Sequence, residues 1–345
     1  MSRETVSVEM GKRAVLLLAH GTPDVLGEMA EYLSKVTGGR PLPGEVVKEL
    51  QHRYAQIGLR ETPGVEAPPL TKWTMTQGYL LEQALGGDKV YVGMRNWHPY
   101  IADVVAQMRT DGLTNIKAVC LAPQNSRTSV GLYRRAVLAA ASGIEVEFVA
   151  GWAESPVLAE AFAERLRPVW AEACAEAGRR VPVLFTAHSV PCRTIMTGEA
   201  SVAGTRPGTP VQDSPDPYPI EAKRTAQMVV ERMAVAGLSE NDWYFAFQSQ
   251  GMSGGPWIGP TVEETLKAIK GQGHVGVVMQ PVGFLCDHVE ILYDIDIAFR
   301  EIASELGLKL WRAESLNDSP LLVKALVEVV SGRYKATVDE VTVPA

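Results

Sequence analysis

The stretch Ala14-Val-Leu-Leu-Leu-Ala-His-Gly-Thr-Pro23 is an apolar run that ends directly in a histidine and a turn. The same arrangement returns half a chain later, in Val181-Pro-Val-Leu-Phe-Thr-Ala-His-Ser-Val-Pro191. A short apolar run bounded by turn residues is typical of a strand buried in a parallel sheet. Ligands of such sheets bind outside the carboxyl ends of the strands. The repeat therefore predicts two similar α/β halves, which present His20 and His188 at their ligand-binding ends.

The size and charge of the chain limit its class. Its 345 residues exceed what one hydrophobic core usually holds, which favours two domains. With 33 basic and 40 acidic side chains the net charge is −7, which argues against nucleic acid and anionic membranes as partners. The apolar fraction of 46% is that of an ordinary globular protein.

The sequence also predicts a cytoplasmic location. No apolar run reaches the roughly 18 residues that a membrane span needs, so we expect no stable membrane insertion. The residues before Ala14 lack the apolar core of a signal peptide. The four cysteines are scattered without a C-x-x-C spacing, so we expect a reducing compartment and neither a zinc finger nor an iron–sulfur cluster. They are Cys120, Cys174, Cys192 and Cys286.

Apolar runs alternate with helical patterns along the whole chain, which predicts an α/β fold with two parallel sheets flanked by helices. Ser155-Pro156 predicts a helix start, and Gly178 its end. We place the boundary between the lobes inside this helix, giving an N-terminal lobe at 1–165 and a C-terminal lobe at 166–345. The predicted strands are 14–19, 89–94, 117–122 and 145–150, then 181–187, 243–248, 275–280 and 308–311.

A line of carboxylates follows the predicted strand at 275–280. If a regular helix begins near Asp287, then Glu290, Asp294 and Glu301 share one of its faces. Asp287-x-x-Glu290 is also the spacing of a capping box, in which Glu290 would only close the helix start. Carboxylates beside an imidazole such as His188 suit proton transfer or a borderline divalent metal such as Fe²⁺.

Other predicted strand ends combine arginine, tryptophan, asparagine and serine, at 93–99, 121–127 and 248–257. Arginine pairs with carboxylates, and aromatic rings pack on flat faces, so this mixture suits a large flat ligand with peripheral carboxylates. Ordinary packing is the alternative for Trp97 and Trp257. No phosphate-binding glycine motif is present, which argues against a nucleotide enzyme. The long Gly- and Pro-rich loop at 196–217 is either an active-site lid or a surface insertion.

Taken together, these motifs resemble the ferrochelatase family, from about Ala14 to about Val330. The matching motifs are Gly21-Thr22-Pro23, Arg95-Asn-Trp-His-Pro99, Leu121-Ala-Pro123, Phe185-Thr-Ala-His-Ser-Val-Pro191, Asp216-Pro-Tyr-Pro219, Gln248-Ser249, Pro256-Trp-Ile-Gly-Pro260 and Pro281-Val-Gly-Phe-Leu-Cys-Asp-His-Val-Glu290. The resemblance implies two Rossmann-like lobes with a porphyrin cleft between them.

The resemblance also implies roles for individual residues. His188 and Glu290 match the metal-site and catalytic positions of the family. Asp294 matches an acidic position one turn further on and is also expected to bind the metal. His20 falls where many relatives carry a tyrosine that faces the porphyrin metal. The positions expected to bind substrate are His20, Arg40, Arg53, Tyr54, Arg95, Trp97, Ser126 and Tyr133.

The expected reaction is insertion of Fe²⁺ into coproporphyrin III in haem biosynthesis, because the chain shares the short segment after the first strand with the branch that uses this porphyrin. Iron is then a substrate, no organic cofactor is expected, and other haem-pathway enzymes are candidate partners. The alternatives are a protoporphyrin IX ferrochelatase, a sirohydrochlorin-type chelatase and a non-catalytic haem carrier. A two-lobed sugar- or amino-acid-binding protein would need an export signal.

The sequence departs from the family pattern at four places. The family's Gly-Gly-x-Ser-Pro-Leu motif is replaced by the longer stretch 58–70, which puts its serine contact in doubt. Ala298 stands where a third acidic residue is expected, and Gln124 replaces a histidine after Leu121-Ala-Pro123. The insertion at 196–215 is longer than in most relatives.

Overall fold

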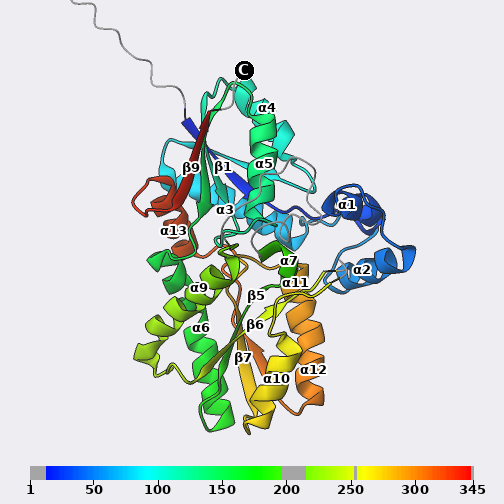
Figure 1. Cartoon of the computed structure of the whole chain (residues 1–345), viewed down its shortest axis with the longest axis vertical. Helices are drawn as coiled ribbons and strands as arrows, with labels where there is room; N and C mark the ends of the chain where they lie inside the picture. Colours follow the sequence, from blue (N-terminus) through cyan, green and yellow to red (C-terminus); the bar gives the residue numbers. More distant parts are fainter. Residues whose placement is uncertain (1–12, 196–214, 252–254, 343–345) are drawn as a thin grey trace, which may run out of the picture.

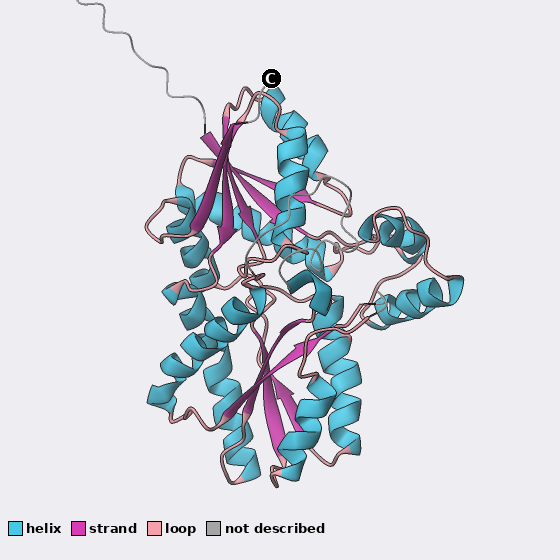
Figure 2. Cartoon of the chain, viewed as in Figure 1, coloured by secondary structure: helices cyan, strands magenta, loops and turns pink. Residues whose placement is uncertain are grey.

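Two β-sheets flanked by helices build the chain, so the predicted α/β class is confirmed (Figure 2). The computed structural model describes residues 13–195, 215–251 and 255–342. In Figure 1 one sheet lies above the other, and helices cover both faces of each. The predicted lid or insertion at 196–217 lies almost wholly outside the described residues.

The first sheet has the strand order β2-β1-β3-β4-β9. Its first four strands are parallel neighbours and lie within two residues of their predicted positions. Strand β9 was not predicted and pairs antiparallel with β4. The strands are β1 (Arg13–Ala19), β2 (Lys89–Met94), β3 (Asn115–Cys120), β4 (Glu145–Gly151) and β9 (Thr337–Thr342).

The second sheet has the order β6-β5-β7-β8, and all its neighbours are parallel. Its four strands also lie within two residues of the predicted positions. The central strands are buried on both faces, because helices cover the sheet on each side. The strands are β5 (Val183–His188), β6 (Trp243–Gln248), β7 (Gly276–Pro281) and β8 (Lys309–Arg312).

The helices cover the sheets and form one projection beside them. Within the described ranges, no helix is long and apolar enough to cross a membrane. The α-helices are α1 (Met29–Val36), α2 (Gly44–Gln56), α3 (Pro69–Leu85), α4 (Ile101–Thr110), α5 (Val130–Ala140), α6 (Pro156–Ala177), α7 (Cys192–Ile195), α9 (Tyr218–Met233), α10 (Val262–Gly271), α11 (Val289–Leu292), α12 (Arg300–Glu305) and α13 (Pro320–Val330). Short 3₁₀ turns occupy Leu26–Glu28 and Ala234–Ala236, and a π-helical segment occupies Asp294–Phe299.

Helix α6 joins the two lobes and begins and ends where the sequence predicts. The Ser155 hydroxyl accepts a hydrogen bond from the Leu158 amide, which satisfies one of the free N–H groups at the helix start. Gly178 ends the helix in the left-handed conformation, with φ of 63°. The helix is continuous through Pro168, so the boundary placed at residue 165 falls inside a packed helix rather than in a linker.

The C-terminal part of the chain returns to the first lobe, which corrects the predicted assignment of 166–345 to the second lobe. Strand β9 extends the first sheet, and α13 packs on both α6 and α3. The sequence did not reveal this return, because β9 is a single antiparallel edge strand without the apolar run that marks the buried strands.

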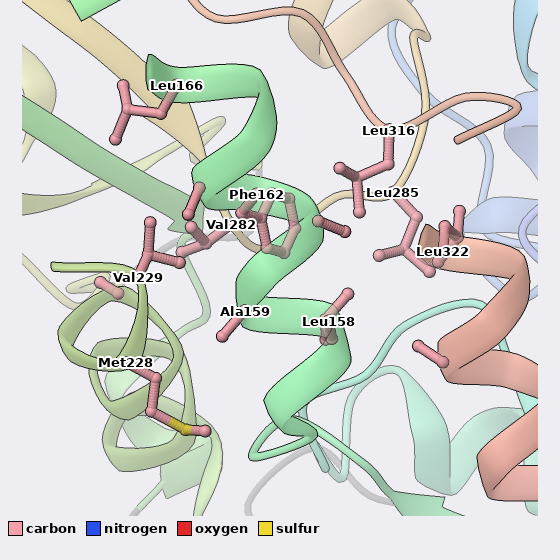
Figure 3. Packing of buried hydrophobic residues seen from close by; sticks show 14 of the residues in the cluster. Leu158, Ala159, Phe162, Leu166, Met228, Val229, Val282, Leu285, Leu316 and Leu322 are labelled. Atoms are coloured by element: carbon pink, nitrogen blue, oxygen red, sulfur yellow. The ribbon is translucent and has the colours of Figure 1, made fainter. Parts of the chain in front are cut away.

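The largest hydrophobic cluster lies between the two sheets and ties the lobes together. It contains residues of β1 and β5 as well as the buried face of α6. Figure 3 shows Phe162 in the middle of this cluster, with Val229 of α9 on one side and Leu322 of α13 on the other. Because close-packed interiors resist rearrangement, this cluster holds the two sheets at a fixed separation.

Replacing Phe162 by alanine tests this role of α6. The ring is completely buried, so the substitution should lower the free energy of unfolding by about 3–5 kcal/mol. Urea denaturation measures the change. As a control, Val235→Ala alters a side chain that is 89% exposed and should cost no more than about 0.5 kcal/mol. Equal effects of the two substitutions would contradict the assignment.

Candidate active site

A cleft of about 1420 Å³ lies where the carboxyl ends of the two sheets face each other. From the first lobe it is lined by residues that follow β1 and β3, among them His20 and Ser126. From the second lobe it is lined by residues at the ends of β5, β6 and β7, including His188. The α1–α2 arm (residues 26–56), which projects at the right of Figure 1, supplies one side wall.

His188 and Glu290 form an ion pair on the second-lobe wall of the cleft. The imidazole Nε2 lies 3.1 Å from Glu290 Oε1, and the imidazole Nδ1 donates to the Ser189 carbonyl. His188 is the last residue of β5, and Glu290 lies in the first turn of α11. The fold therefore brings together the imidazole and the carboxylate that the sequence singled out, although 102 positions separate them.

A second imidazole contacts the same carboxylate. His288 Nε2 lies 3.2 Å from Glu290 Oε2, while its Nδ1 lies 2.9 Å from the Cys286 carbonyl. Glu290 therefore has a histidine at each of its two oxygens. The sequence analysis quoted His288 inside a motif but gave it no role. The i, i+2 spacing to Glu290 was the only available signal, and it is too common to indicate a contact.

The charges of this pair shift the pKa values of both partners. Burial alone would lower the pKa of His188, but the adjacent Glu290 carboxylate outweighs it and raises that pKa to about 8. Burial would raise the pKa of Glu290, but His188 and His288 hold it well below its ordinary value. At neutral pH the pair is a protonated imidazole bound to a carboxylate, and one proton lies between two potential metal ligands.

The capping-box interpretation of Glu290 is wrong. Helix α11 begins after His288, whose side chain makes no capping hydrogen bond. The Asp287 carboxylate instead accepts hydrogen bonds from Ser315 and Asn317. The Glu290 side chain is thus free of a capping role and faces the cleft histidines.

The predicted regular helix from Asp287 is also wrong. A π-helical segment at Asp294–Phe299 separates α11 from α12. A π-turn carries an extra residue relative to an α-helix, so the α-helical spacing does not hold beyond it. Glu301 is exposed and does not line the cleft, which removes it from the predicted line of carboxylates.

Asp294 lines the cleft one turn beyond Glu290. Its carboxylate accepts a hydrogen bond from the Ser249 hydroxyl, and burial raises its pKa to about 6 in spite of that bond. Ser249 has a φ of 60°, a conformation that residues other than glycine rarely adopt and that often marks functional sites. Asp294 therefore lies beside the His188–Glu290 pair, as a group that can take up a proton near neutral pH.

His20 lies on the opposite wall, at the end of β1. Its Nδ1 lies 3.1 Å from the Gly21 carbonyl, and Asn96 Nδ2 lies 2.9 Å from its Nε2. Burial, together with the nearby Arg95, lowers the pKa of His20 to about 4, so the ring is neutral. Because Nδ1 faces a carbonyl, it carries the proton, and Nε2 accepts from Asn96. His20 thus lines the cleft and also bonds the turn.

The first-lobe wall carries most of the predicted substrate-binding residues. The Arg95 guanidinium lies 5.9 Å from the centre of the Tyr133 ring, and its Nε is buried without a partner within the described residues. On the α1–α2 arm, Arg53 pairs with Glu49 and lies 5.1 Å from the centre of the Tyr293 ring of the second lobe. Ser126, Arg40 and Tyr54 complete this group on the cleft wall.

Trp97 does not reach the cleft, which corrects its predicted role in substrate binding. It is 2% exposed and packs behind the wall against Tyr32. Its indole N–H donates to Asp24. Packing thus explains Trp97, whereas Trp257 lines the cleft with its ring 6.5 Å from that of His188.

Gln124, at the position where a histidine was expected, lines the cleft and also joins the lobes. It is 2% exposed, and its amide donates to the Val282 carbonyl and to the Thr225 hydroxyl. The replacement of the family's histidine by Gln124 therefore puts an amide in place of an imidazole at a buried contact between the lobes. The stretch 58–70 supplies several residues of the cleft wall, including Arg60 and Leu70.

The donor set of the site suits a metal ion that passes through it. Within residues 13–195, 215–251 and 255–342, no group of three or more His, Cys, Asp or Glu residues is arranged to hold a metal ion. His188 and Glu290 provide one nitrogen and one oxygen donor, which a borderline divalent ion accepts. Two protein ligands leave the other coordination positions open to water or to a second ligand.

An α/β fold with an imidazole–carboxylate pair facing a cleft large enough for a macrocycle is the arrangement expected of a metal chelatase. The ferrochelatase family model matches residues 12–334. A ferrochelatase of Acidobacterium capsulatum is 57% identical over 337 residues, covering 97% of this chain and 98% of that protein. The chain belongs to the ferrochelatase family, whose reaction is a step of haem biosynthesis.

Two further proteins are similar at greater distance. A coproporphyrin III ferrochelatase of Geobacillus kaustophilus is 31% identical over 330 residues, covering 93% of this chain and 95% of that protein. Among solved structures, SirB from Bacillus subtilis with Fe³⁺ has a TM-score of 0.49 and 11% identity, covering 93% and 94% of the two chains.

The pKa of His188 can be measured directly by proton NMR of the imidazole in the porphyrin-free protein. We expect a midpoint near pH 8, with the ring protonated below it. Glu290→Gln removes the charge that raises the pKa, so burial then moves the midpoint to lower pH.

The matched control is Glu301→Gln, which removes a carboxylate of the same segment that is exposed and outside the cleft. It should leave the His188 midpoint unchanged. A midpoint that stays near pH 8 in Glu290→Gln contradicts the ion pair.

Proposed function

We propose that this protein inserts Fe²⁺ into coproporphyrin III and releases coprohaem and two protons. The observation that carries the proposal is the His188–Glu290 pair on one wall of the cleft, facing an arginine-containing wall on the other lobe. The pair offers the metal a nitrogen and an oxygen ligand, and the opposite wall offers positive charge to the propionates of a porphyrin.

The chemistry explains why two opposed walls are needed. A free porphyrin is planar, with two N–H protons at its centre, and the incoming metal must lose water and displace both protons. A rigid cleft can hold the ring distorted, so that nitrogen lone pairs face the metal, with the strain supported by contacts elsewhere on the ring. The interlobe core described above supplies that rigidity.

His188 and Glu290 are the residues that meet the metal and the protons in this proposal. When Fe²⁺ binds, the proton between Nε2 and Oε1 leaves, and both atoms become metal ligands. As the metal leaves these two atoms and passes into the ring, they become free to accept a pyrrole proton that it displaces. Asp294, which has a pKa of about 6, is placed to take a proton onward. His188 and Glu290 share the two tasks, metal delivery and proton acceptance.

The unpaired arginines favour a substrate with several carboxylates. Arg40, Arg60 and Arg95 line the cleft, and none of them has a carboxylate partner within the described part of the chain. Arginine binds carboxylates through two parallel hydrogen bonds. Coproporphyrin III has four propionates and protoporphyrin IX has two, so the first can satisfy more of these cations. Protoporphyrin IX remains the second candidate.

We propose that His20 faces the bound ring from the lobe opposite His188, as a neutral imidazole. Iron is a substrate here, and the proposal requires no organic cofactor and no iron–sulfur cluster. All four cysteines are free thiols, which supports a reducing cytoplasm. Enzymes of the same pathway are the candidate partners, because the porphyrin must be supplied and the haem consumed. A sirohydrochlorin chelatase or a haem carrier would share the cleft but not the proposed turnover.

Substitution of the metal-binding pair tests the proposed mechanism. His188→Ala should lower iron insertion at least about 100-fold, because the imidazole provides the metal ligand and proton acceptor. Glu290→Gln should also be severely slowed, since an amide neither takes a proton nor binds Fe²⁺ as an anion. Anaerobic mixing of Fe²⁺ with porphyrin, followed by absorbance, measures the rate.

Porphyrin binding is the control for these variants, because it depends on contacts spread over the cleft. The dissociation constant, measured by fluorescence quenching, should stay within about threefold of the parent. Turnover of His188→Ala within a few-fold of the parent would refute the assignment. A carrier without catalytic activity would show porphyrin binding and no insertion in the parent itself.

Comparison of the two porphyrins tests the substrate. The parent should have a higher kcat/KM for coproporphyrin III than for protoporphyrin IX. Arg95→Leu should reduce this preference, because it removes a buried cation without a carboxylate partner. The control is Arg109→Leu, which alters an exposed arginine of α4 that is not part of the cleft. Equal or higher kcat/KM with protoporphyrin IX contradicts the proposal.

A further inference from the structure

We propose that Arg312, at the end of β8, is a positioning residue that holds both ends of the segment carrying Glu290 and Asp294. Arg312 lies behind this segment and is absent from the lining of the cleft. Its guanidinium contacts one aspartate before Glu290 and one aspartate after Asp294. The inference rests on the proposed function, because it concerns how the metal-binding carboxylates are held in place.

The stronger of the two contacts is with Asp296, inside the π-helical segment. Arg312 Nε donates to Asp296 Oδ1 at 2.7 Å, and Nη2 donates to Oδ2 at 2.9 Å. This is a bidentate pair, which fixes direction as well as distance. The Arg312 side chain is 13% exposed and that of Asp296 24%, so water screens the pair only partly.

The second contact is with Asp287, just before α11. Arg312 Nη1 lies 3.5 Å from Asp287 Oδ1, which also accepts from the Ser315 hydroxyl at 2.7 Å. Asn317 completes the arrangement, since its amide donates to Asp287 Oδ2 and its side-chain oxygen accepts from the Asp287 backbone N–H. Asp287 is thus anchored by Arg312 at the end of β8 and by Ser315 and Asn317 of the loop that follows.

The hydrogen bonds that hold Asp287 continue through Asn317 into the first lobe. Asn317 has a φ of 45°, and its carbonyl accepts a hydrogen bond from Gln77 of α3 at 2.8 Å. Gln77 is completely buried. The position of Asp287 therefore depends on both lobes, and the segment from Asp287 to Asp296 is held at a fixed place relative to the cleft.

The contacts of Arg312 with Asp287 and Asp296 form a clamp on the segment between them. The π-helical turn inside this segment explains why the clamp is needed. Such turns are rare and occur mostly as single-turn interruptions of α-helices, so the competing arrangement of this segment is a return to α-helical geometry. That change would rotate the residues on one side of the turn relative to those on the other. Asp294 begins the π-segment and Glu290 precedes it, so their relative placement depends on this geometry. Arg312 bridges the two ends and opposes the change.

The clamp predicts that loss of Arg312 lowers turnover and leaves porphyrin binding intact. In Arg312→Gln, kcat for metal insertion should fall at least about tenfold, since small displacements of reacting groups are costly. KM and the dissociation constant for coproporphyrin III should stay within about twofold, because Arg312 does not line the cleft. Arg312→Lys keeps the charge but not the bidentate geometry, so it should fall between the parent and Arg312→Gln.

Hydrogen exchange of the porphyrin-free protein provides a readout that does not depend on activity. In Arg312→Gln, amides of the segment 289–299 should exchange faster, while those of α6 should not change. The matched control is Arg300→Gln, which removes a more exposed guanidinium 3.5 Å from the same Asp296 carboxylate. It should leave kcat and exchange near parental values. If Arg312→Gln does not fold, Asp296→Asn tests the same pair and should give the same pattern.

The combined results of hydrogen exchange and kcat test the clamp independently of the proposed substrate. Faster exchange at 289–299 together with a fall in kcat supports the clamp, whichever porphyrin proves to be the better substrate. Faster exchange with unchanged kcat overturns it, because the segment would then not need to be held. Faster exchange throughout the chain, or equal losses of kcat and porphyrin binding, also overturns it and assigns Arg312 to general stability.

Discussion

The contact between the His188 imidazole and the Glu290 carboxylate is the interaction on which the site depends. Each group alone would be costly to keep charged at a partly buried position, and together they stabilise each other's charged form. The pair stores a proton where a divalent metal would bind. A metal that binds there must displace the proton, so metal binding and proton release are coupled at the same two atoms.

Each lobe contributes different residues to the cleft. The second lobe carries the His188–Glu290 pair at the end of β5 and the start of α11, while the first lobe carries Arg95 and the neutral His20. The core around α6 keeps the walls apart, and buried hydrogen bonds such as that from Gln124 to the Val282 carbonyl fix their relative position. This arrangement gives a rigid cleft, as distortion of a bound ring requires.

The sequence predicted the architecture well because buried parallel strands leave long apolar runs, and the histidines at their ends were visible for the same reason. It did not predict β9, which has no such run, or the π-helical segment, since an i→i+5 hydrogen bond leaves no periodic pattern. Trp97 was wrongly predicted to bind substrate, because a motif shows which residues are adjacent in the sequence but not which of them face the cleft. The contact of His288 with Glu290 was missed because an i, i+2 spacing is too common to indicate a contact. The network around Arg312 depends on chain reversals, which local spacing does not encode.

The central claim is that His188 and Glu290 together form the site at which the metal enters. The most direct measurement is the location of a divalent ion in crystals of the porphyrin-free protein, with Zn²⁺ in place of the oxidisable Fe²⁺ and with anomalous scattering to identify it. The account predicts an ion about 2.0–2.2 Å from His188 Nε2 and from a Glu290 oxygen, with their direct contact broken. An ion bound elsewhere, with the contact between His188 and Glu290 intact, would contradict it.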